Sequence, residues 1–110
     1  MRKRIFLPFI ILLLGVTSYA QDRIEISLKH SSRVEIQTKE QLQRLLQTYD
    51  LSRWIFTRSI LIDEQAIPHS HPVLTLHTRH LKDDELLLSS FVHEQLHWFL
   101  VQRDKGRRGL

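Results

Sequence analysis

The 110-residue sequence contains no cysteine and only three glycines and three prolines, and it lacks an apolar run of bilayer-spanning length. Without cysteine no disulfide bond can form, so a cross-link that stabilises the fold has to be a metal ion or a partner. Residues 5–16 form the main apolar run, which Pro8 interrupts. This run is well short of the ~20 residues of a transmembrane helix. A permanent membrane anchor is therefore not expected.

Residues 1–20 have the pattern of a secretory signal peptide. A basic start at residues 2–4 precedes the apolar run, and small residues lead to Ala20. Signal peptides combine these three features and are removed from the mature protein. We therefore predict cleavage between Ala20 and Gln21 and export of the mature chain, which would be periplasmic or secreted.

Removal of this signal peptide leaves a chain of almost balanced charge. Three of the 16 Lys and Arg residues lie in it, whereas all 12 Asp and Glu residues follow it, so 13 basic side chains face 12 acidic ones. A nucleic-acid partner is not expected at this charge. Residues 21–103 are predicted to form one small domain, and residues 104–110 a basic C-terminal tail. Domains this short commonly depend on metal binding or oligomerisation.

The start of the predicted domain alternates between apolar and polar residues. The alternation runs from Ile24 to Leu28 and resumes at Val34 and Ile36. A period of two is typical of half-buried strands. We therefore predict a strand pair, or one long bent strand, within residues 23–37.

The middle of the chain predicts one helix and two strands. Thr38 and Gln41 have the spacing of a capping box, and leucines on one stripe follow, so a helix is expected over residues 39–49. Composition and alternation then predict a strand, a proline-containing loop and a short strand, over residues 54–62, 63–72 and 73–78.

A long helix is predicted over residues 83–102. The acidic residues 83–85 occupy its first turn, where negative charge is favoured. Apolar residues recur around most of its circumference, which is typical of a helix inside a domain. We therefore expect His93 and His97 to point into a packed interior or cleft. The predicted fold is α+β, with a small mixed sheet and two helices.

This helix contains the segment His93-Glu94-Gln95-Leu96-His97, whose residues we expect to take part in metal binding and catalysis. Histidines four residues apart lie on the same helical face, so both imidazoles can reach one divalent ion. Glu94 lies ~100° further round, where its carboxylate can reach a water on that ion without ligating it. Zinc lowers the pKa of bound water to ~7 and polarises a carbonyl, while a nearby carboxylate can take the proton. The pattern predicts hydrolysis of peptide or amide bonds.

The motif helix resembles that of the zincin metallopeptidases, which carry the same H-E-x-x-H pattern. The resemblance implies that His93 and His97 are Zn²⁺ ligands, that Glu94 is the general base, and that peptides or proteins are the substrates. Zincins pair an extended substrate with an edge strand before this helix, and residues 73–78 are suitably placed. The expected fold is similar to the N-terminal half of a zincin.

The third zincin ligand normally follows the motif, and no such residue is visible in this sequence. The metzincin extension requires Gly and His where this chain has Leu100 and Arg103. Asp104 lies ~10 Å along the helix from His97, too far to share an ion. We therefore expect a C-terminally truncated or frameshifted form of a longer zincin.

The sequence leaves two alternatives to an exported zinc-dependent metallopeptidase-like protein. One is a catalytically incompetent remnant that binds metal weakly or not at all. The other is an exported interaction module that dimerises through the apolar helix. His69 and His71 are a further option for metal ligation, but an H-x-H pattern in a loop is more often solvated surface.

Overall fold

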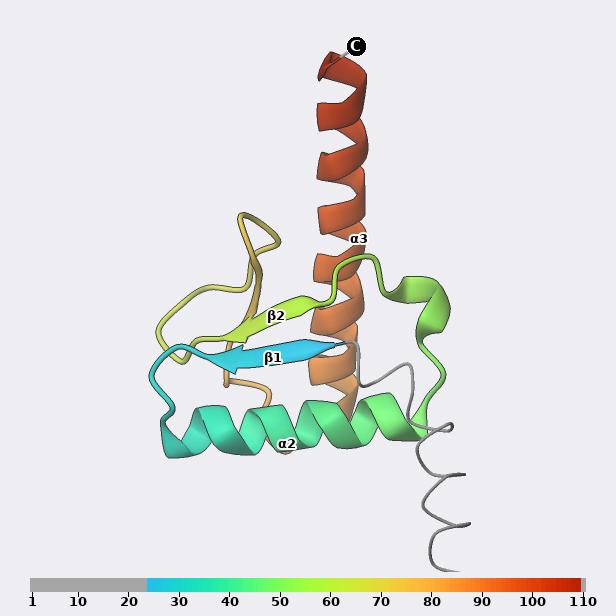
Figure 1. The fold of residues 1–110 in the computed structure, drawn as a ribbon. Coiled ribbons are helices and arrows are strands. Elements are labelled where there is room, and N and C mark those ends of the chain that lie inside the picture. The colour runs from blue at the N-terminus through green and yellow to red at the C-terminus, as the bar shows by residue number, and fades with distance from the viewer. Residues whose placement is uncertain (1–23, 110) are drawn as a thin grey trace, which may run out of the picture.

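The computed structural model describes residues 24–109, so the predicted signal peptide and its cleavage site lie outside the described residues. The elements follow in the order β1 (Glu25–Leu28), α2 (Arg33–Thr48), the 3₁₀ turn η2 (Ser52–Trp54), β2 (Ser59–Ile62), β3 (Leu74–Leu76) and α3 (Asp84–Gly109) (Figure 1). No helix within these residues is both long enough and apolar enough to cross a membrane.

The three strands form one parallel sheet in the order β1-β2-β3. Ile26 pairs with Ile60 and Ile60 with Leu74, so β2 is the central strand. Within residues 24–109, one isolated antiparallel bridge, between His69 and Thr75, adds to these parallel pairs. The predicted α+β class with two helices is confirmed.

One face of the sheet carries the core. Side chains alternate along a strand, so Ile60 and Ile62 of β2 lie on the same face as Leu74 and Leu76 of β3. Both helices pack against this face. The buried cluster consists of Leu42, Leu45 and Leu46 of α2, Ile60 of β2, Leu74 and Leu76 of β3, and Leu87 and Phe91 of α3.

Helix α2 begins six residues earlier than predicted, at Arg33. Its N-cap is Ser32, whose Oγ accepts a hydrogen bond from the N–H of Glu35 at 3.2 Å. The Glu35 carboxylate in turn accepts from the N–H of Ser32 at 3.3 Å. This capping box gives hydrogen-bond acceptors to two backbone N–H groups at the helix start, those of Ser32 and Glu35. The predicted strand at Val34 and Ile36 is therefore wrong.

The predicted strand over residues 54–62 is shorter in the structure. Only Ser59–Ile62 pairs with neighbouring strands, and Ser52–Trp54 forms a 3₁₀ turn. The N–H groups of Phe56 and Thr57 bond to the side chain of Gln95 on α3, which leaves them unavailable to a strand. A side-chain partner on a distant helix thus makes β2 begin later than predicted.

Helix α3 continues to Gly109, which places most of the predicted C-terminal tail in the helix. Its 26 residues correspond to about 39 Å of helix. Figure 1 shows α3 crossing the direction of α2 and extending well beyond the sheet towards the C-terminus. The core residues Leu87 and Phe91 lie in its first half, so the second half has less of the domain to pack against.

Candidate metal centre

The histidines of the H-E-x-x-H motif face solvent in the middle of α3. Each follows a fully buried residue, Phe91 or Gln95, by two positions. At ~100° per residue this places His93 and His97 ~200° from the core side. Both are exposed, and the side chain of His97 is 56% accessible. The prediction that they point into a packed interior is wrong, because no second layer within residues 24–109 covers this face of α3.

The three residues predicted for the site nevertheless come together. The rings of His93 and His97 have centroids 4.4 Å apart and planes inclined by 48°. One donor atom from each of His93, Glu94 and His97 lies within 4.8 Å of the other two. A single turn of α3 therefore presents two imidazole nitrogens and a carboxylate oxygen in one place.

Glu94 differs from the two histidines because its side chain is only 8% exposed. Its Oε1 is inaccessible to solvent and accepts no hydrogen bond from the described residues. The Nδ1 atom of His97 lies 3.8 Å from this oxygen, which is too far for a hydrogen bond. Buried polar atoms almost always have partners, so this oxygen is suited to receive a proton donor or an ion.

The rotation of α3 about its axis is fixed by Gln95, which is fully buried. Its Oε1 accepts hydrogen bonds from the N–H groups of Phe56 at 2.7 Å and Thr57 at 2.9 Å. Its Nε2 donates to the carbonyl of Thr57 at 2.8 Å. With Gln95 held towards the core, the histidines on either side of it in the motif have to face outwards. No role was predicted for Gln95 from the sequence. A polar residue among the apolar residues of a helix could have indicated a buried side chain with hydrogen-bond partners.

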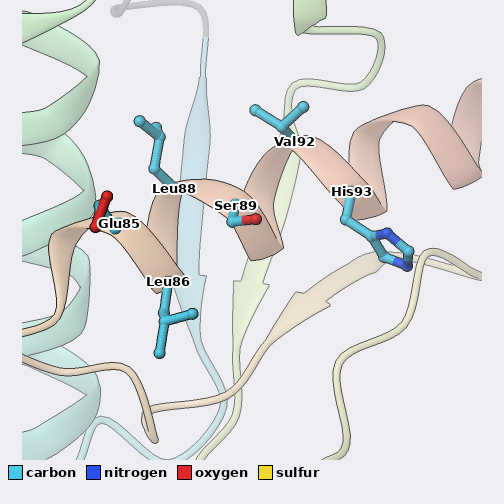
Figure 2. Close-up of a pocket in the computed structure, with 6 residues that line it drawn as sticks. All are labelled: Glu85, Leu86, Leu88, Ser89, Val92 and His93. Atoms are coloured by element: carbon cyan, nitrogen blue, oxygen red, sulfur yellow. The ribbon is translucent and has the colours of Figure 1, made fainter.

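An open hollow of about 710 Å³ lies along α3 beside the motif. Figure 2 shows that Leu86 and His93 extend to one side of the helix, and Leu88 and Val92 to the other. Glu85 and Ser89 complete the lining, so every lining residue comes from α3. The hollow is a surface feature of one helix and not a cleft between two layers.

The loop histidines make contacts of their own. His71 stacks on Trp98 with ring centroids 5.9 Å apart, and its Nε2 lies 3.1 Å from Oε1 of Gln102. Nδ1 of His69 lies 2.7 Å from the carbonyl oxygen of Ile67. Neither ring belongs to the donor group that residues 24–109 form on α3, so the further option of metal ligation by His69 or His71 gains no support at this site.

A second group of donors, His30, Glu35 and Asp63, was missed by sequence analysis. Here the carboxylate is committed to the fold, since Glu35 accepts from the N–H groups of His30 at 2.8 Å and Glu64 at 2.9 Å, in addition to that of Ser32. Burial, the largest single influence, acts to raise the pKa of Glu35, but these hydrogen bonds and the nearby His30 together lower it. The capping-box spacing of Ser32 and Glu35 was the feature of the sequence that could have identified Glu35 as a structural residue.

The edge strand expected to pair with a substrate is partly occupied. The N–H of Thr75 donates to the carbonyl of His69 at 2.8 Å, and the carbonyl of Thr75 accepts from the N–H of His69 at 3.1 Å. These two bonds use both backbone groups at the centre of β3 on its outer side. A substrate cannot pair there unless the segment at His69 moves.

Comparison with known proteins gives no relative from which a function could be transferred. No protein-family model, curated protein or solved structure matches the chain. The function therefore has to be argued from the geometry of α3.

Proposed function

We propose that this chain is an exported zinc-dependent metallopeptidase-like protein that hydrolyses peptide bonds in peptides or proteins. The observation that carries the proposal is the donor group of His93, Glu94 and His97, whose atoms lie within 4.8 Å of one another on one helical turn. The same group contains a buried carboxylate oxygen, Oε1 of Glu94, that has no hydrogen-bond partner among residues 24–109.

The donor set is chemically suited to zinc. Imidazole nitrogen and carboxylate oxygen are both ordinary zinc ligands, and a histidine pair four residues apart on a helix can share one ion. Both imidazoles are exposed, so an ion can reach them from solvent. When bound, zinc supplies an acidified water and a positive charge that polarises a substrate carbonyl.

The role that this proposal gives Glu94 is proton transfer. Its Oε1 has lone pairs that no described residue uses, so it is free to accept a proton. This oxygen lies 3.8 Å from Nδ1 of His97, so the carboxylate is beside the proposed zinc ligands. A positioned general base of this kind contributes roughly 10²–10⁴-fold in rate.

A second candidate is a metal-binding protein without hydrolytic activity. The observation that favours it is that, within residues 24–109, no further His, Asp or Glu joins the donor group of His93, Glu94 and His97. A catalytic zinc site has three protein ligands and one open position. If Glu94 acts as the base, only His93 and His97 remain as ligands from this part of the chain.

Metal content and hydrolysis, measured on matched variants, test the proposal. His93→Ala and His97→Ala should abolish tight zinc binding by equilibrium dialysis, whereas His69→Ala should bind zinc like the wild type. Glu94→Gln should keep the zinc and lose hydrolysis of an unstructured protein by at least a hundredfold. Zinc binding with no measurable hydrolysis in the wild type, at protein concentrations low enough to keep it monomeric, would establish the second candidate, and absence of zinc binding would refute both.

The predicted export has a separate test. Mass spectrometry of the protein recovered outside the cytoplasm should show Gln21 as the first residue, because the signal-peptide pattern places the cleavage site after Ala20. Recovery only of protein that retains Met1, in the cytoplasm, would contradict export and leave the proposed zinc site unaffected.

A further inference from the structure

The outward face of α3 offers zinc fewer donors than the ion normally takes. Structural zinc sites are four-coordinate. Glu94 is directed towards the domain, with its side chain only 8% exposed, so the outward face presents two imidazoles, those of His93 and His97. We propose that a second copy of the chain supplies two more, so that one zinc ion bridges the α3 helices of a homodimer. This inference rests on the proposed role of His93 and His97 as zinc ligands.

The surface around the two histidines is suited to pairing with another helix. At ~100° per residue, Leu86, His93, His97 and Leu100 fall within an arc of ~60° on α3. Leu86 is 50% exposed, and Figure 2 shows it extending on the same side of the helix as His93. Leu100 is half-buried, so the two leucines flank the histidines as a narrow stripe with partly exposed apolar area at each end. The histidines lie within the stripe, so the metal and the apolar contacts can act together.

The charges of α3 favour an antiparallel arrangement of the two copies. Glu85 lies in the first turn of the helix, and Arg103 and Lys105 lie near its end, whereas Asp84 is already paired with Arg44 of α2 at 2.7 Å. In a parallel pair, like charges would meet at both ends. A twofold axis between His93 and His97 instead brings the acidic end of each helix to the basic end of the other.

One salt bridge between the copies follows from this geometry. Glu85 and Arg103 are 18 residues apart, which is roughly five whole turns, so both lie on the same flank of α3. Equivalent flanks meet in an antiparallel helix pair, and both residues are exposed. Glu85 of each copy therefore approaches Arg103 of the other, and the contact occurs twice in the dimer.

The dimer also regulates the proposed site. Four imidazoles fill the coordination sphere, whereas hydrolysis requires an open position on the metal. The bridged dimer is therefore inactive, and dissociation exposes the His93 and His97 pair of each chain.

Sedimentation equilibrium with added zinc tests the bridge. Metal-free protein should sediment as a monomer, zinc should double the mass with one ion bound per two chains, and EDTA should reverse the change. His93→Ala and His97→Ala should remain monomeric with zinc, whereas His69→Ala should dimerise. A monomer with one zinc per chain would overturn the bridge but not the zinc site. Absence of zinc binding would overturn both, and a dimer that persists in EDTA would overturn the bridge alone.

A charge exchange tests the antiparallel orientation. Glu85→Arg creates two like-charge contacts in the dimer, so the Kd of the zinc-dependent dimer should rise about tenfold. Adding Arg103→Glu should return the Kd to within about threefold of the wild type. Glu40→Arg, an exposed position on α2, is the matched control and should leave the Kd unchanged. Equal Kd values for Glu85→Arg and Glu40→Arg would refute the antiparallel pairing.

Discussion

Replacement of Gln95 by Leu tests the conclusion that this residue holds the motif helix in place. Leucine has a similar volume and suits a buried position, so the change removes hydrogen bonds without leaving a large cavity. The wild-type amide group makes three such bonds, two to Phe56 and Thr57 as acceptor and one to Thr57 as donor. All three link α3 to a segment nearly 40 residues away in the sequence.

The expected loss can be worked from these contacts. A hydrogen bond contributes about 1 kcal/mol net, and a backbone group that loses its partner away from water costs as much again or more. Three bonds therefore correspond to a loss of about 3 kcal/mol, of the same order as much of the stability of a small domain. The spacing of His93 and His97 belongs to the helix itself, so zinc binding at low temperature should persist.

Urea unfolding of the metal-free protein, followed by circular dichroism, measures the effect. Gln47→Leu is the matched control, because Gln47 is exposed on α2 and surface changes of this kind stay within about 0.5 kcal/mol. A loss below about 1 kcal/mol for Gln95→Leu would refute the reasoning that these bonds fix α3.

Two further predictions concern the acid stability and the core. Glu35 has a lowered pKa, so its contribution to stability is present above the ordinary glutamate pKa of about 4.3 and is lost as the pH falls through the lowered value. The melting temperature should therefore fall less between pH 7 and pH 3 in Glu35→Gln than in the wild type, and equal falls would contradict this. Phe91→Ala should cost about 3–5 kcal/mol in urea unfolding, because Phe91 is fully buried. Phe99→Ala, at a 38% exposed position, should cost less than half as much, and equal losses would contradict the assignment of the core.

Long periodic segments of the sequence predicted their structures well. The helix predicted over residues 83–102 is present as Asp84–Gly109, and the strand predicted over residues 73–78 as Leu74–Leu76. The periodicity of such segments reflects burial against the sheet, so it carries information about the tertiary structure as well as the local one.

The start of α2 could not be decided from local pattern alone. Thr38 with Gln41 and Ser32 with Glu35 both have capping-box spacing. The second pair forms the cap, and Glu35 also accepts a hydrogen bond from the N–H of Glu64. That contact joins residues 29 positions apart, so the sequence around the helix start does not contain it.

The direction in which the motif side chains point could not be predicted from the local sequence pattern either. Spacing alone predicted that His93, Glu94 and His97 would come together, since one helical turn brings them there. Whether the histidines face the core or the solvent depends on which face of α3 the sheet covers. The bonds of Gln95 to Phe56 and Thr57 decide this, and they connect segments 38 and 39 residues apart.

The unpartnered oxygen of Glu94 predicts a conflict between stability and function. A buried carboxylate oxygen that accepts no hydrogen bond costs about 1–3 kcal/mol, so Glu94→Leu should stabilise the metal-free protein by about 1 kcal/mol or more in urea unfolding. Glu40→Leu, at an exposed position of α2, is the control and should change stability by no more than about 0.5 kcal/mol. Glu94 is not a ligand in the proposed site, so zinc should still raise the stability of Glu94→Leu, by about 2.7 kcal/mol at a hundred times the Kd.

A metal-free Glu94→Leu protein less stable than the wild type would mean that Oε1 has a partner in solution, and the argument from its burial would fail. A gain in stability together with loss of hydrolysis would instead identify Glu94 as a residue kept for its chemistry at the expense of the fold.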